Sequence, residues 1–122
     1  MLTPVFRILD YAAALEFYVG WLGFRVDWEQ QPVKPYDYAQ VSRGDVVIHL
    51  STNPDDSCPG ARVRALTWGL LAYHNQLLDR NQAYTPPTLN PATWSERVME
   101  MEVLDPFGNR IVFCEAPGLR AI

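Results

Sequence analysis

The side chains that could carry chemistry in this chain include two histidines and two cysteines. His49 lies in a run of alternating residues, where an imidazole can hydrogen-bond a ligand, fill the sheet or bind a metal. His74 lies on an apolar stripe beside Tyr73 and Leu77, so we expect a packed structural histidine. We find no serine–histidine–aspartate set and no phosphate-binding loop in the sequence.

The cysteines, Cys58 and Cys114, are far apart in the sequence and form no Cys-x-x-Cys pair. Cys58 lies among aspartate, serine, proline and glycine, which favours an exposed thiol in a loop over a reactive one. The first residues show neither the basic segment nor the apolar stretch of an export signal. We therefore expect a cytoplasmic protein with reduced thiols.

Four aromatic side chains, Trp28, Tyr38, Trp68 and Trp94, lie on or near predicted strands or in a long loop. Aromatic faces bind flat heteroaromatic ligands by stacking and cations by cation–π attraction. The alternative is that they bury a dimer interface. Trp21, in contrast, falls within the first predicted helix, where we expect it to pack.

Three charged residues, Glu100, Glu102 and Arg110, alternate with apolar residues on the last two predicted strands. They could orient a polar ligand in a groove or could form solvated strand faces. The chain as a whole has a net charge of -4 and an isoelectric point of about 5.0. This balance argues against nucleic-acid binding, which needs concentrated positive charge, and mildly favours neutral or cationic partners.

The composition is that of one globular domain: 122 residues, of which 48% are hydrophobic and 20% charged. No apolar run approaches the ~20 residues that span a bilayer. We therefore expect a single domain over residues 1–122 that binds no membrane.

The elements that position these residues form an approximate internal duplication, in which each half runs strand, helix and further strands. In the first half, Asp10 is a plausible helix N-cap and Gly23 a left-handed helix stop. The predicted elements of this half are a strand at 3–9, a helix at 11–22, a strand at 24–29 and a hairpin of 36–43 with 46–51. The hairpin turns at residues 44–45.

The second half repeats this order after a connector at residues 53–60 that is rich in proline, glycine and aspartate. The predicted elements are a strand at 62–68, a helix from 70 to about 81, a long loop at 85–91, and strands at 98–104 and 110–114. The turn between the last two strands, residues 105–108, has Asp, Pro and Gly where a type I turn favours them.

Alternation along the strands predicts which side chains face the helices and which face the opposite side. Phe24, Val26 and Trp28 are expected on one common face. The residues expected on the side away from the helices are Val47, His49, Ser51, Arg62, Arg64, Leu66, Trp68, Glu100, Glu102, Arg110, Val112 and Cys114. Two strand–helix–strand–strand–strand modules, at residues 1–52 and 61–116, predict an α+β fold with two concave mixed sheets.

Six short segments occur in a specific order: PVFRILD at 4–10, ALEFY at 14–18, LGF at 22–24, SRGD at 42–45, DPFGN at 105–109 and FCE at 113–115. This set resembles the glyoxalase/bleomycin-resistance family of the vicinal-oxygen-chelate superfamily, and within it the bleomycin-resistance-like subgroup. The resemblance implies two βαβββ modules and a homodimer with ligand sites in the concave sheets. Its chemistry stays open, because this fold hosts lyases, dioxygenases, thiol transferases, epimerases and plain drug binders.

The resemblance also implies where a superfamily enzyme would hold a divalent metal. Of the four corresponding positions, three carry Thr3, Arg62 and Val112, and only His49 is a metal-ligand type. Glu115 lies nearby, but on the opposite face from Val112. One imidazole holds a metal weakly, so we expect no metal, no other cofactor and no catalytic residues.

The leading hypothesis is a homodimer that sequesters an aromatic or cationic small molecule in a groove at its interface, without chemistry, as bleomycin-resistance proteins do. The alternatives are a superfamily enzyme, a lyase or dioxygenase with an altered ligand set, and a structural or regulatory dimer without a ligand. The candidate ligand-binding residues are Trp28, Tyr38, His49, Trp68, Trp94, Glu100, Glu102 and Arg110.

Overall fold

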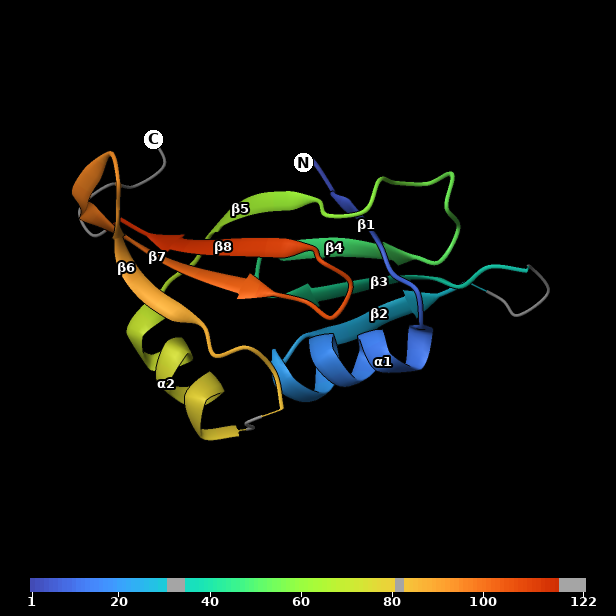
Figure 1. The fold of residues 1–122 in the computed structure, drawn as a ribbon, viewed down its shortest axis with the longest axis horizontal. Coiled ribbons are helices and arrows are strands. Elements are labelled where there is room, and N and C mark those ends of the chain that lie inside the picture. The colour runs from blue at the N-terminus through green and yellow to red at the C-terminus, as the bar shows by residue number, and fades with distance from the viewer. Residues whose placement is uncertain (31–34, 81–82, 117–122) are drawn as a thin grey trace. The chain divides into compact units, whose positions relative to one another are not determined.

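Each half of the chain forms a strand, a helical segment and three further strands (Figure 1). The computed structural model describes residues 1–30, 35–80 and 83–116. The elements of the first half are β1 (Val5–Arg7), α1 (Tyr11–Leu15), η1 (Glu16–Trp21), β2 (Arg25–Glu29), β3 (Tyr38–Arg43) and β4 (Val46–Ser51). Those of the second half are β5 (Arg62–Leu66), α2 (Leu70–Arg80), β6 (Thr88–Ala92), β7 (Ser95–Leu104) and β8 (Arg110–Glu115).

The strands make two four-stranded sheets, with the orders β1-β4-β3-β2 and β5-β8-β7-β6. In each sheet the first strand pairs in parallel with the last, and the other pairs are antiparallel. The predicted α+β fold with two mixed sheets is confirmed. The described helices include none long and apolar enough to span a membrane.

The chain forms two compact units. The first unit contains residues 1–61 and 105–109, and the second contains residues 62–104 and the chain from 110 onward. The turn between β7 and β8 thus belongs to the first unit, although both strands belong to the second. The predicted single domain, with modules at 1–52 and 61–116, stays a prediction.

The core of each unit lies between its sheet and its helical segment. Ile48 and Leu50 are fully buried, as the alternation in β4 predicts. In the second unit, the ring of Tyr73 on α2 meets that of Phe113 on β8 edge to face, with centroids 5.3 Å apart. The opposite face of each sheet is called the open face. On the first sheet it carries Tyr38, Gln40 and His49, and on the second sheet Arg62, Arg64, Glu100, Glu102 and Arg110.

The first helical segment starts as predicted and then widens. The Asp10 carboxylate caps α1 by accepting a hydrogen bond from the Ala13 backbone N–H at 2.9 Å. From Glu16 onward the chain forms a π-helix, which the sequence did not predict, and Leu22 N–H donates to the Phe17 carbonyl. Gly23 ends the segment at a φ of 80°, as expected. Trp21 packs in the core and is 2% exposed.

A β-bulge in β2 makes the predicted common face of Phe24, Val26 and Trp28 wrong. Val26 pairs with Val41, but Trp28 pairs with Gln40, and the register shifts between the two pairs. The extra residue reverses the alternation beyond Val26. Val41 is fully buried in the core, whereas Gln40 lies on the open face. Trp28 is therefore brought to the open face.

The segment predicted as a long loop contains the edge strand β6, which pairs with β7. Pro91 has no backbone N–H, which an edge strand tolerates, and the register shifts immediately after it. Trp94 consequently lies in the turn between β6 and β7. The end of the second helix predicted near Asn81 agrees with α2 ending at Arg80, and Asn81 lies outside the described residues.

The turn after β7 is held by a buried network of the first unit. The Asp105 carboxylate accepts hydrogen bonds from the Tyr18 hydroxyl at 2.7 Å, the Asn109 side chain at 2.9 Å and the Phe107 backbone at 2.8 Å. Asn109 also donates to the Arg7 carbonyl at 2.8 Å. Burial and the Asp105 carboxylate raise the pKa of Tyr18 well above 10.0, so the hydroxyl keeps its proton.

We expect Tyr18→Phe to destabilise the protein by about 1.5–3 kcal/mol, because it removes a buried hydrogen bond to a charged carboxylate. Chemical denaturation measures this loss. Tyr11→Phe is the matched control, since the Tyr11 hydroxyl donates to Glu29 at 2.6 Å in an exposed position. An equal loss in both variants would contradict a special role for the buried network.

Candidate ligand-binding site

Three rings form an aromatic cluster on the open face of the first sheet: Trp28 on β2, Tyr38 on β3 and His49 on β4. The rings of Trp28 and Tyr38 are nearly parallel, with an angle of 9° and centroids 5.9 Å apart. The His49 ring stands edge-on to both, with centroids 5.1 Å from Trp28 and 5.2 Å from Tyr38. Trp28 is 44% exposed, so its ring remains accessible.

Hydrogen bonds continue from this cluster across the sheet. The Tyr38 hydroxyl lies 2.7 Å from Nδ1 of His49, and Nε2 of His49 lies 3.0 Å from Oε1 of Gln40. The Gln40 amide donates in turn to Oδ2 of Asp27 at 3.1 Å. Four side chains on three adjacent strands are thereby linked.

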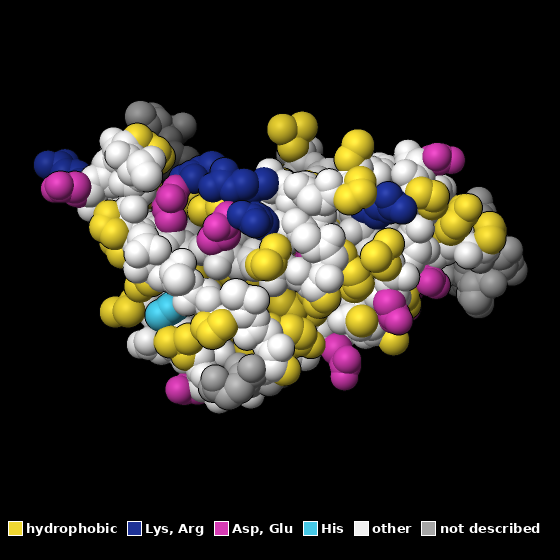
Figure 2. Space-filling model, viewed as in Figure 1, with side chains coloured by type: hydrophobic (Ala, Val, Ile, Leu, Met, Phe, Trp, Pro, Cys, Tyr) yellow, Lys and Arg dark blue, Asp and Glu magenta, His cyan; other side chains and the backbone are white. Residues whose placement is uncertain are grey.

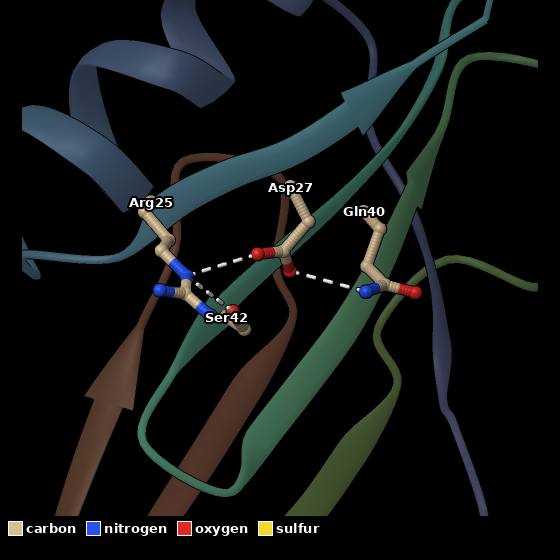
Figure 3. Close-up of polar contacts among 4 residues, drawn as sticks. All are labelled: Arg25, Asp27, Gln40 and Ser42. Carbon is tan, nitrogen blue, oxygen red and sulfur yellow. Dashed lines mark hydrogen bonds and ion pairs between the residues drawn. The ribbon is translucent and has the colours of Figure 1, made fainter.

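Asp27 anchors the far end of this chain of hydrogen bonds (Figure 3). Hydrogen bonds from Ser42 and Gln40, and the nearby Arg25 guanidinium, lower the pKa of the Asp27 carboxyl below 3.8. Nε of Arg25 lies 3.0 Å from Oδ1 of Asp27 and 3.4 Å from the Ser42 hydroxyl. Asp27 is therefore ionised at neutral pH and can only accept hydrogen bonds.

The ionised carboxylate fixes the orientation of every group along the chain. Gln40 must turn its NH₂ group toward Asp27, which leaves its carbonyl oxygen facing His49. Nε2 of His49 therefore carries the proton, and Nδ1 accepts from the Tyr38 hydroxyl. Burial lowers the pKa of His49 below 6.5, which agrees with a neutral ring.

Burial and the negative charge of Asp56 raise the pKa of Tyr38, so its hydroxyl stays protonated. Since this hydroxyl donates to His49, the Tyr38 oxygen keeps lone pairs that can accept a hydrogen bond from a ligand. The cluster thus offers aromatic faces and one oriented acceptor. It suits a flat molecule that carries an N–H or O–H group.

The charged residues predicted for the site form ion pairs on the open face of the second sheet. Arg64 pairs with Glu100, with Nη1 and Oε2 2.5 Å apart. Arg62 and Arg110 both approach Oε1 of Glu102, at 3.3 and 3.9 Å. Glu102 and Arg110 also line a small cavity. The sequence placed both on this face, but gave no sign that Arg62 would share the carboxylate.

The predicted tryptophans of the second unit are exposed. Trp68 follows β5 and is 62% exposed, and Trp94 is 66% exposed. The guanidinium carbon of Arg64 lies 5.9 Å from the centroid of the Trp94 ring, within the range of a cation–π contact. Trp94 and the Arg64–Glu100 pair are therefore neighbours.

Val112 and Cys114 lie on the open face of the second sheet, as predicted, but they do not line an accessible groove. They are 1% and 5% exposed. Cys114 forms a small apolar cluster with Ala92, Val98 and Ala116. The open face of this sheet therefore buries apolar side chains of its own beneath the charged ones.

The eight predicted site residues are divided between the units. Trp28, Tyr38 and His49 belong to the first unit, and the other five belong to the second: Trp68, Trp94, Glu100, Glu102 and Arg110. Sequence reasoning missed Asp27 and Gln40, which orient His49. Gln40 could have been found, because it lies two residues from Tyr38 and thus on the same strand face.

The donor groups do not fit the divalent metal of the superfamily enzymes. Arg62 is paired with Glu102, Val112 offers hydrocarbon, and both nitrogens of His49 are engaged in hydrogen bonds. The Glu115 carboxylate accepts hydrogen bonds from the backbone N–H of Gly69, just before α2, at 3.1 Å, and from that of Leu70, the first residue of α2, at 3.0 Å. Within the described ranges, no three His, Cys, Asp or Glu side chains are grouped to hold a metal ion. That the protein holds no metal or other cofactor stays a prediction.

Comparison with known proteins identifies a family whose profile covers nearly the whole chain. The profile of a family described as "glyoxalase superfamily protein" matches residues 1–118. None of the curated proteins compared with the chain matches it.

Solved structures share the fold at low sequence identity. A bleomycin-binding protein from bleomycin-producing Streptomyces verticillus, complexed with copper(II)-bleomycin, is 24% identical, with a TM-score of 0.69 over 92% of each chain. TnmS3, an antibiotic-binding protein from Streptomyces sp. CB03234, is 20% identical, with a TM-score of 0.69 over 93% of each chain. A glyoxalase/bleomycin resistance protein/dioxygenase superfamily member from Sphaerobacter thermophilus is 21% identical, with a TM-score of 0.67 over 93% of this chain and 94% of that chain.

Nuclear magnetic resonance of the imidazole nitrogens tests the orientation of the network. We expect neutral His49 to carry its proton on Nε2 and to titrate with a pKa below 6.5. Tyr38→Phe removes the donor that stabilises neutral His49, so the pKa should rise. The unfolded state binds this proton at a higher pH than the folded state does, because its His49 pKa is higher. The contribution of neutral His49 to the free energy of unfolding is therefore lost as the pH falls from about 6.5 to the lower pKa of the folded state.

A proton on Nδ1 of neutral His49 would contradict the assigned network. Tyr11→Phe is the control, because it removes an exposed tyrosine hydroxyl that donates to Glu29 rather than to His49. It should leave the His49 titration unchanged.

Proposed function

Because the chain belongs to the glyoxalase superfamily, we propose that it is a small-molecule-binding protein that sequesters a flat aromatic or cationic ligand without chemistry. The observation that carries this proposal is the half-exposed cluster of Trp28, Tyr38 and His49. Solved structures with this fold include bleomycin-binding and antibiotic-binding proteins, which supports a ligand of the bleomycin class. We place this function in the cytoplasm.

The cluster supplies two kinds of recognition. The accessible ring of Trp28 offers a stacking surface, and a contact between aromatic rings adds about 0.5–1.5 kcal/mol beyond the area it buries. The Tyr38 oxygen, held in place by His49, selects the part of the ligand that donates a hydrogen bond. The net charge of -4 attracts a cationic ligand from a distance.

A second copy of the chain is the proposed cover for the open faces. Each sheet has its helix on one face only (Figure 1), and large apolar side chains such as Leu66, Trp68 and Trp94 are 62 to 68% exposed. A permanent homodimer typically buries more than ~2,000 Å² in total. The proposed ligand groove lies at that interface.

Titration with copper-free bleomycin, followed by tryptophan emission, tests the ligand. We expect saturable binding that weakens as salt rises, because salt screens charges beyond about 8 Å. Trp28→Ala should abolish the response. His49→Ala should weaken binding by roughly 1 kcal/mol through the lost orientation of Tyr38.

Trp21→Phe is the control for this titration, because Trp21 is buried in the core and should affect stability rather than affinity. A response to another aromatic metabolite alone would support the aromatic cluster as a binding site and exclude bleomycin as its ligand. Silence across a broad aromatic and cationic panel would contradict ligand binding and favour a structural dimer. Turnover of a bound compound would favour the enzyme alternative.

Light scattering at micromolar concentration measures the assembly. We expect about twice the chain mass of 13.9 kDa, because the exposed apolar side chains need a cover. A monomer would overturn the proposed groove as well as the dimer.

A further inference from the structure

The open face of the second sheet concentrates positive charge on a chain that is acidic overall. Three guanidinium groups, of Arg62, Arg64 and Arg110, face two carboxylates, of Glu100 and Glu102, which leaves one positive charge in excess. Figure 2 shows basic side chains gathered over β5 and β8, with acidic side chains beside them. The net charge of the whole chain is -4, so the charge of this patch is opposite in sign to that of the chain.

The excess charge is localised at one end of the face. Arg64 and Glu100 form a close ion pair at 2.5 Å, in which the two charges offset each other. The remaining carboxylate, that of Glu102, is approached by two guanidinium groups through a single oxygen. Arg62 and Arg110 are direct neighbours on the parallel strands β5 and β8.

Within the described part of the chain, most of the hydrogen-bond donors of these two arginines are unused. Arg62 donates to Glu102 through Nε at 3.3 Å, and its two terminal nitrogens have no further partner among the described residues. Nη1 of Arg110 lies 3.9 Å from the same oxygen, which is too far for a hydrogen bond. Among the described residues, the Arg110 side chain has no hydrogen-bond partner. The side chains of Arg62 and Arg110 are 55% and 52% exposed.

A cavity of about 180 Å³ is lined in part by Arg110, and Arg62 is the strand neighbour of Arg110 rather than a lining residue. Its lining combines apolar, hydroxyl and charged groups, from Thr85, Pro86, Thr88, Glu102, Leu104 and Arg110. Cross-strand pairs place Thr88 beside Glu102, and Leu104 beside Arg110. Since an apolar cavity of about 150 Å³ can hold a benzene molecule, this cavity has room for one small ring.

We propose that this cavity binds a small organic carboxylate. The planar fork of Arg110 and the terminal nitrogens of Arg62 receive the two carboxylate oxygens, since guanidinium groups bind carboxylates through paired hydrogen bonds. The apolar body of the ligand lies against Pro86 and Leu104. The residues of this site belong to the second unit, whereas those of the aromatic cluster belong to the first.

Isothermal titration with benzoate tests the proposal on the full chain. We expect saturable binding of one benzoate per chain, with affinity falling at least tenfold in Arg110→Gln and in Arg62→Gln. Glu102→Gln should bind benzoate several-fold more tightly, because it removes the carboxylate that competes for the same donors. Arg97→Gln is the matched control, since Arg97 is an exposed arginine of β7 that, among the described residues, neither lines the cavity nor forms an ion pair with Glu102 as Arg62 and Arg110 do.

Two competitors define the ligand class. Benzamide, which has the same shape without the charge, should not displace benzoate. Inorganic phosphate should compete only weakly, because it makes no use of the apolar wall. Displacement by benzamide, or by phosphate at equal affinity, would overturn the assignment to an organic carboxylate.

Three further outcomes would overturn the site. These are non-saturable binding, an equal loss in Arg97→Gln, and an unchanged affinity in Arg110→Gln that retains the wild-type melting temperature. Trp28→Ala should bind benzoate as wild type does, while it loses the ligand of the aromatic cluster. Failure of either site can therefore be recognised separately.

Discussion

The bulge in β2 is the constraint on which the aromatic site depends. A regular strand would place Trp28 on the same side as Val26, against the core. One extra residue instead sends Asp27 and Trp28 to the same face, opposite Gln40. Trp28 then meets Tyr38 and His49, and Asp27 meets Gln40.

This local irregularity has an electrostatic consequence several ångströms away. The charge on Asp27 orients the amide of Gln40, and the amide selects the protonated nitrogen of His49. A chain of hydrogen bonds of this kind determines which atom of each group is the donor and which the acceptor, because each group can donate only where its neighbour accepts. The bulge therefore fixes both the shape of the cluster and the polarity of the Tyr38 oxygen.

The sequence predicted most of the fold, because strong periodic signals repeat in both halves. The Asp10 cap, the Gly44–Asp45 turn and the buried alternation of Ile48 and Leu50 are all local patterns. The features that it missed depend on tertiary pairing. The bulge after Val26 and the edge strand β6 exist because a neighbouring strand offers partners to a chain with weak local preference.

The candidate sites show the same division. Alternation placed His49, Glu100 and Glu102 on the face away from the helix, because one residue's position determines the next along a regular strand. It could not predict which charges pair across strands. The sharing of Glu102 by Arg62 and Arg110 depends on the register of β5, β8 and β7, which no local pattern specifies.

The irregularities in the edge strands β2 and β6 have a consequence for association. An uninterrupted edge strand is a template for adding strands of another molecule, a route to amyloid-like growth. Here β2 carries a bulge and charged side chains, and β6 carries a shift of register next to Pro91. Within the described residues, the ladder of backbone groups is therefore interrupted along both β2 and β6. The bulge that brings Trp28 into the aromatic cluster thus also disfavours the addition of strands from other molecules along β2.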